Sequence, residues 1–217
     1  MDKHTLFSQK FWSFILTRHE EYKHKINQIL LVSKKDPNFR LSRASNGGDY
    51  ISLEDHTQTN VYAWKSDWYL HYHFPILKEL CEDIKPYLTQ IIKEEKIKKT
   101  STIETVNCWI NKYKKGDFAK PHAHEPQGWS VIYFMNIPEG DAVFRVHNPL
   151  GLTYNSELLE NFATLDLKAK EGSVIIMSGA IKHEATPNTS KKERTTIAMN
   201  FRMYDNFSTK PKSDKEK

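Results

Sequence analysis

The chain has 217 residues, of which 38% are hydrophobic and 12% aromatic, so its length and composition favour one folded domain and exclude a disordered chain. The formal net charge of +5 permits an acidic partner such as nucleic acid, but much of the excess lies in two short runs, at residues 93–99 and 210–217. We expect the second run to be a disordered basic tail rather than a nucleic-acid-binding arm.

The first hundred residues are predicted to be mainly helical. Apolar side chains recur at three- and four-residue steps over residues 1–35, and Asp36-Pro37 breaks this pattern. Turn-forming residues then predict a loop over 45–60. A second helical stretch follows over about residues 67–96, with Pro75 and Pro86 at the starts or kinks of its pieces.

The chain changes character after about residue 100. Alternating apolar residues and β-formers predict strands over 103–113, 130–137, 142–146, 163–167, 173–177 and 195–203. Several short strands at close spacing are typical of a sandwich, barrel or jelly roll. The predicted fold class is therefore α+β, in which a β-barrel core at 101–205 carries a helical support at 1–100. We expect one domain over 1–209, because the helices need a sheet face on which to bury their apolar residues.

No targeting or membrane segment is predicted. Cys81 and Cys108 form no CxxC pair and suggest no disulfide framework. Residues 1–10 lack the apolar core of a signal peptide, and no apolar run approaches the roughly 18 residues that a membrane span needs. We expect a soluble, cytoplasmic protein without a membrane partner.

Three of the ten histidines could hold a metal ion. His122 and His124 flank one alanine, and residues i and i+2 of a strand face the same side, although two solvent-facing histidines would also explain the pair. His183 follows the predicted strand 173–177, where a barrel mouth would lie. Imidazole suits iron, zinc and copper alike, so the histidines alone do not select the metal. His71 and His73 share the spacing but lie in a predicted helix, where i and i+2 diverge.

An arginine that could bind a carboxylate, Arg194, lies eleven residues after His183. Arg194 begins the last predicted strand, and Thr196 lies two residues further on, so both side chains can point the same way. A guanidinium binds a carboxylate bidentately, and a neighbouring hydroxyl adds a donor. The alternative is a structural salt bridge from Arg194 to Glu193 or Glu184.

Several motifs occur in a characteristic order. They are Ser45-Asn46-Gly47-Gly48-Asp49-Tyr50, Asn107-Cys108-Trp109-Ile110-Asn111, Pro121-His122-Ala123-His124, Ser130-Val131-Ile132-Tyr133-Phe134, Gly172-Ser173-Val174, His183, Pro187-Asn188, Arg194-Thr195-Thr196 and Asn200-Phe201. This set resembles the 2-oxoglutarate/Fe(II)-dependent oxygenases, and more narrowly a poorly characterised branch from bacteria and phages. The resemblance covers most of the chain and is strongest over 103–203.

The resemblance implies a double-stranded β-helix fold of the jelly-roll or cupin-like type, with iron(II) and 2-oxoglutarate as small-molecule cosubstrate. It implies that His122 and His183 bind the metal, that Arg194 and Thr196 hold the far carboxylate of 2-oxoglutarate, and that Tyr133 lines the pocket. The implied reaction is a dioxygenase reaction, usually hydroxylation, of an unidentified organic or peptidyl substrate, with release of succinate and CO2.

His124 stands where the wider superfamily has Asp or Glu. We take it as the third ligand, but Glu125 or Asp141 could supply a carboxylate instead, or the metal could be weak or lost. Two rival hypotheses stay open, namely a non-catalytic cupin-like barrel and a nucleic-acid-binding module. No feature of the sequence reads a base.

Overall fold

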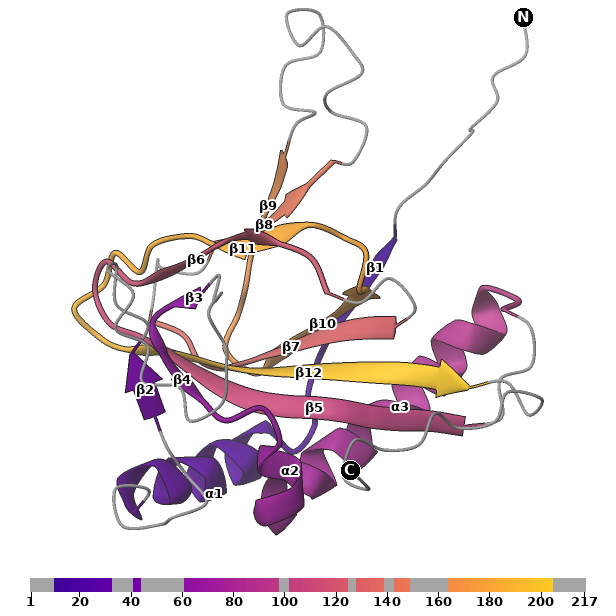
Figure 1. Cartoon of the computed structure of the whole chain (residues 1–217), viewed down its shortest axis with the longest axis horizontal. Coiled ribbons are helices and arrows are strands. Elements are labelled where there is room, and N and C mark those ends of the chain that lie inside the picture. The colour runs from indigo at the N-terminus through magenta and orange to yellow at the C-terminus, as the bar shows by residue number, and fades with distance from the viewer. Residues whose placement is uncertain are drawn as a thin grey trace, which may run out of the picture.

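The core is built from two antiparallel sheets that face each other (Figure 1). The computed structural model describes residues 10–32, 41–43, 61–97, 102–124, 128–138, 143–148 and 164–204. The larger sheet has the strand order β1-β10-β7-β12-β5-β4-β2, and the smaller has the order β3-β6-β11-β8-β9. The predicted α+β class is confirmed, but four strands of the two sheets come from the first hundred residues, which were predicted to be mainly helical.

The larger sheet consists of β1 (Phe11–Ile15), β2 (Leu41–Arg43), β4 (Trp64–Ser66), β5 (Thr102–Tyr113), β7 (Gly128–Asn136), β10 (Ser173–Ser178) and β12 (Arg194–Tyr204). The smaller sheet consists of β3 (Val61–Tyr62), β6 (Phe118–His122), β8 (Val143–His147), β9 (Thr164–Lys168) and β11 (His183–Ala185). All six predicted strands are present, with ends that differ by a few residues.

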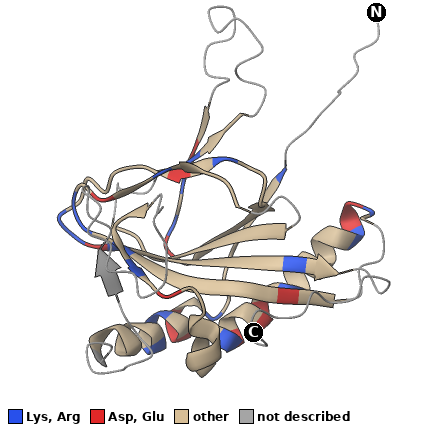
Figure 2. Cartoon of the chain, viewed as in Figure 1, with Lys and Arg blue, Asp and Glu red and all other residues tan. Residues whose placement is uncertain are grey.

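The helices cover the outer face of the larger sheet (Figure 1). They are α1 (His19–Val32), α2 (Leu70–His73) and α3 (Pro75–Glu94). Figure 2 shows that they carry charges of both signs, whereas the long strands β7 and β12 are largely uncharged. The predicted helical stretch at 67–96 is thus confirmed; Pro75 begins α3, and Pro86 lies inside it.

Strand alternation divides the core into two layers. On β7, Val131, Tyr133 and Met135 pack with the helices, whereas Ile132 and Phe134 face the smaller sheet. This is the period-two geometry of a strand, in which successive side chains point to opposite faces. The inner layer therefore forms the barrel interior, and the site described below lies there.

The prediction of helix at residues 11–15 is wrong. This aromatic segment forms β1, which pairs in register with β10 from Phe11 opposite Met177 to Ile15 opposite Ser173. Its apolar spacing fits a helix, but aromatic residues also favour strands, and the open edge of β10 supplies backbone partners. Helix α1 starts only at His19.

Several predicted segments lie outside the described residues, among them the loop at 45–60 and the tail at 210–217. Within the described ranges, none of the helices has the length and apolar run that crossing a bilayer requires.

Candidate metal centre and cosubstrate pocket

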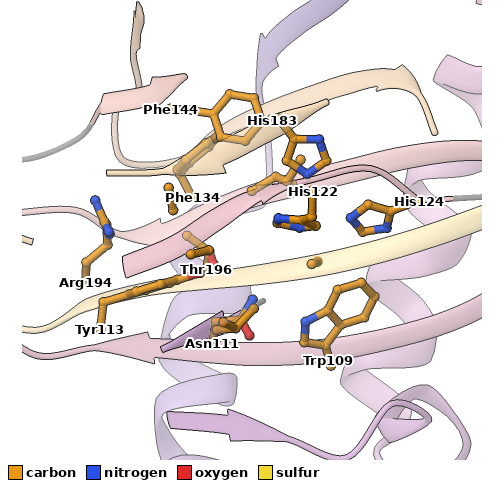
Figure 3. Close-up of a pocket in the computed structure, with 15 residues that line it drawn as sticks. Trp109, Asn111, Tyr113, His122, His124, Phe134, Phe144, His183, Arg194 and Thr196 are labelled. Atoms are coloured by element: carbon orange, nitrogen blue, oxygen red, sulfur yellow. The ribbon is translucent and has the colours of Figure 1, made fainter. Parts of the chain in front are cut away.

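The three predicted histidines meet at one point inside the barrel (Figure 3). Strands β6 and β11 are antiparallel neighbours in which His183 stands directly opposite His122, and the ring centroids of this pair are 4.6 Å apart. His124 lies just beyond the end of β6, where its backbone N–H donates to the carbonyl of Gly179 at 2.8 Å. One nitrogen from each ring lies within 4.8 Å of the other two.

Each ring is held by its Nδ1 atom. His122 Nδ1 lies 2.6 Å from the carbonyl oxygen of Lys120, and His183 Nδ1 lies 2.8 Å from that of Ile181. His124 Nδ1 lies 2.7 Å from Oδ1 of Asn200, on β12. Because a carbonyl oxygen can only accept, Nδ1 carries the proton in these bonds, and the lone pair of each neutral ring lies on Nε2.

This arrangement fits a metal. His124 Nε2 is buried and has no hydrogen-bond partner among the described residues, as expected for a nitrogen meant to coordinate an ion. Metal-binding histidines commonly donate their other N–H to a carbonyl or carboxylate, which fixes the tautomer. Three neutral imidazoles suit iron, and they leave coordination positions for a cosubstrate.

Burial keeps the three rings neutral. Desolvation is the main cause that lowers the pKa of His124 to about 4, and it is also the main cause that lowers the pKa values of His122 and His183. The proximity of the other imidazoles lowers the pKa values of His124 and His183 further. At neutral pH a metal ion therefore meets little competition from protons.

The carboxylates weighed as third ligands, Glu125 and Asp141, lie outside the described residues. Among the residues that the structure describes, the three histidines are the one group of His, Cys, Asp or Glu close enough to hold a metal. His71 and His73 do not form such a group, and they lie in the short helix α2 as predicted.

The histidines form part of the wall of a pocket between the two sheets (Figure 3). The pocket is lined by Val61, Trp109, Asn111, Tyr113, Ala119, His122, His124, Ile132, Phe134, Phe144, His183, Ala185, Arg194, Thr196 and Ala198. The predicted residues Arg194 and Thr196 thus lie in the same cavity as the histidines. Most of the remaining wall is apolar or aromatic, as in cavities that bind small molecules.

Arg194 is almost fully buried, with 2% of its surface exposed. Its Nη2 donates to the carbonyl of Thr186 at 2.6 Å, and its guanidinium lies 4.5 Å from the ring centroid of Tyr113. The two carboxylates weighed as its structural partners form other salt bridges, Glu193 with Lys112 and Glu184 with Arg145. A buried cation in a ligand-sized cavity is suited to bind an anionic group.

Residues 107–200 match the family model described as "Putative 2OG-Fe(II) oxygenase". The matched segment runs from β5 to β12 and contains the three histidines together with Arg194 and Thr196. Residues 107–200 make up less than half of the chain, and their match supports a 2-oxoglutarate/Fe(II) oxygenase. Its cofactors are therefore iron(II) and 2-oxoglutarate, for which the histidine group offers a metal site.

Several solved structures have a similar fold. A prolyl-4-hydroxylase from Pseudomonas putida is 12% identical, with a TM-score of 0.59 over 90% of this chain and 93% of that one. HygX from Streptomyces hygroscopicus, solved with nickel and 2-oxoglutarate, is 10% identical, with a TM-score of 0.58 over 93% and 85%. The epimerase SnoN from nogalamycin biosynthesis is 8% identical, with a TM-score of 0.63 over 89% and 77%.

At such low identity these neighbours show the double-stranded β-helix fold alone, and their activities differ from one another. No curated protein matches the sequence of this oxygenase.

The oxygenase pocket departs from prediction at Tyr133, which does not line it. The Tyr133 side chain faces the helices, and its hydroxyl lies 2.7 Å from Nδ1 of His19 on α1. Its neighbours Ile132 and Phe134 face the pocket instead, as strand alternation requires. The tyrosine of the pocket is Tyr113, which the same period-two count along β5 from Trp109 would have identified.

Proposed function

We propose that this oxygenase is a hydroxylase in which His122, His124 and His183 hold the iron and Arg194 anchors 2-oxoglutarate. The observation that supports it most is the combination of one nitrogen from each of the three imidazoles, all within 4.8 Å of one another, with a buried guanidinium in the same cavity. A non-catalytic cupin-like barrel would explain the histidines, but it gives no reason for burying Arg194 in the cavity that they line.

The side chains of the pocket have separable tasks. The three histidines would hold the iron, and the keto-acid end of the cosubstrate would bind to the same ion. Arg194 binds the distal carboxylate through charge-assisted hydrogen bonds, and Thr196 adds a hydroxyl donor on the same strand face. When bound, the iron supplies the oxygen-activating redox chemistry that no side chain can provide.

The apolar wall contributes by keeping water out. Phe134 and Phe144 lie edge to face, with ring centroids 6.0 Å apart, and Phe144 also lies 5.2 Å from the ring of His183. Such packing lowers the local dielectric constant, which strengthens the attraction between Arg194 and a carboxylate. The overall reaction would convert 2-oxoglutarate and O2 to succinate and CO2 while one oxygen atom enters a C–H bond of an organic or peptidyl substrate.

The proposal is tested by succinate formation from 2-oxoglutarate with the iron(II)-loaded chain. We expect His122→Ala and His183→Ala to abolish turnover, whereas His73→Ala, which removes an exposed histidine of α2, should leave it unchanged. Wild-type turnover in either site variant, with metal present, would contradict the assignment. Once a substrate is found, label from 18O2 should appear in the product; a product without label would exclude hydroxylation.

A further inference from the structure

A second polar cluster lies on the inner face of β4 and β5, beside the histidines. Trp109 and Asn111 alternate along β5 and line the pocket (Figure 3), with 3% and 4% of their surface exposed. Lys65, on β4, is the cross-strand partner of Asn111 and therefore shares its sheet face; it is 5% exposed. We call these three residues the β4/β5 cluster.

The described residues leave the polar groups of this cluster unsatisfied. The indole Nε1 of Trp109 and the amide Oδ1 of Asn111 are buried without a hydrogen-bond partner among the residues that the structure describes. Within the same ranges no carboxylate lies within salt-bridge distance of Lys65. Its ammonium rests on aromatic rings instead, 2.9 Å from the ring centroid of Trp68 and 5.4 Å from that of Trp109.

Aromatic contacts do not compensate for burying this charge. The attraction between a cation and an aromatic ring is weaker than the cost of removing an ammonium from water. The cost of burying the charge prevails, because burial lowers the pKa of Lys65 to about 7. Native proteins rarely bury polar groups without partners, so the indole N–H of Trp109 and the amide oxygen of Asn111, beside the buried Lys65, indicate that a ligand completes them.

The Lys65 and Trp109 end of the cluster lies away from the Arg194 anchor, whereas Asn111 is the cross-strand partner of Thr196. Trp109, Asn111 and Tyr113 occupy alternate positions on β5, and Arg194 stacks on Tyr113 at one end of this row. At the other end Trp109 stacks on His124, with ring centroids 5.9 Å apart and an interplanar angle of 20°. The charge of Lys65 acts on the histidine group, since it contributes to lowering the pKa values of His122 and His124.

We propose that the β4/β5 cluster binds an anionic group of the substrate, a carboxylate or a phosphate monoester, beside the metal centre. Lys65 and the Trp109 N–H donate to the anion, and the Asn111 amide completes the contact. This inference rests on the proposed function, in which 2-oxoglutarate already occupies the Arg194 end of the pocket. Lys65 lies outside the segment that matches the family model.

The test uses the full chain loaded with zinc and 2-oxoglutarate, titrated with acetate and with methyl phosphate. The NMR signals of [13Cε]lysine and of the indole N–H report on Lys65 and Trp109, with Lys65→Met and Trp109→Phe used to assign them. We expect both signals to shift saturably with one or both anions. A response to acetate alone identifies a carboxylate, and a response to methyl phosphate alone identifies a phosphate.

In Lys65→Met the dissociation constant read at the indole should rise at least about tenfold, because a charge-assisted donor is lost. Lys65→Arg, which keeps the charge, should stay within about threefold. Lys112→Met is the matched control, since Lys112 belongs to β5 but pairs with Glu193. Silence of both signals, or an anion response that survives in Lys65→Met but disappears in Arg194→Met, would overturn the inference. Failure of 2-oxoglutarate to bind in these samples would count against the proposed function instead.

Discussion

The hydrogen bond from His124 to Asn200 offers a sharp test of how the metal centre is built. His122 and His183 are tethered by backbone carbonyls, which substitution cannot remove, whereas His124 is tethered by a side chain. Asn200→Ala deletes the acceptor 2.7 Å from Nδ1 and frees the ring to rotate or to take the other tautomer. The lone pair on Nε2 is then no longer held toward the ion.

The expected loss follows from the geometry. A single hydrogen bond contributes about 0.5–1.5 kcal/mol net, and outer-shell partners of metal ligands are worth roughly 10- to 100-fold in metal affinity. Since the ring of His124 keeps its packing against Trp109, we expect the lower part of this range, about 10- to 30-fold. Asn200→Asp retains an acceptor and should recover most of the affinity.

Competitive cobalt(II) titration of the metal-free chain measures this affinity directly. Asn107→Ala is the matched control, because Asn107 is the cross-strand partner of Asn200 and no hydrogen bond to His124 is seen from it. An unchanged affinity in Asn200→Ala, or an equal loss in Asn107→Ala, would refute the view that the side-chain tether orients the third ligand.

Three further predictions follow from the pocket. Arg194→Met should raise the 2-oxoglutarate concentration for half-maximal succinate release about 100-fold or more, since a buried carboxylate would lose its partner; an unchanged requirement would return Arg194 to a structural role. Tyr113→Phe should weaken 2-oxoglutarate binding while Tyr133→Phe leaves it unchanged, and equal effects in binding titrations would contradict the two assigned faces. The pKa of His124 is lowered from 6.5 to about 4 on folding, so its stabilising contribution is complete above pH 6.5 and is lost as the pH falls toward 4. In urea unfolding of the metal-free protein, the free energy of unfolding should therefore fall more steeply over this pH range in the wild-type chain than in the His124→Gln variant. Parallel pH profiles of the two proteins would contradict this prediction.

The strands that build the barrel were predictable, but those that carry the ligands were not. The six strands in the predictions have clear alternation and turn signals at their ends. In contrast, β6 has only five residues and includes Pro121, and β11 has only three. A proline argues against predicting a strand. Three residues are too few to show the alternation of apolar and polar side chains that identifies one. Their pairing depends on the partner strand, which sequence alone does not reveal.

The metal centre was predictable in composition but not in detail. The His-x-His pair and the distant His183 pointed to convergence, and the structure brings the three rings together. Sequence could not show that Nδ1 of each ring is tethered, because the partners of His122 and His183 are backbone carbonyls. Tyr133 was expected in the pocket from the motif alone. The alternation of side chains along β7 instead places it on the face that packs against the helices. Lys65 gave no signal at all, since a lysine on a short strand normally points to solvent.

Anaerobic titration of iron(II) and 2-oxoglutarate into the full chain, followed by visible absorption, tests the central claim most directly. Convergence of His122, His124 and His183 on one ion predicts a weak charge-transfer band that saturates at one iron per chain and is absent in His183→Ala. Iron binding without such a band, or an undiminished band in His183→Ala, would contradict it.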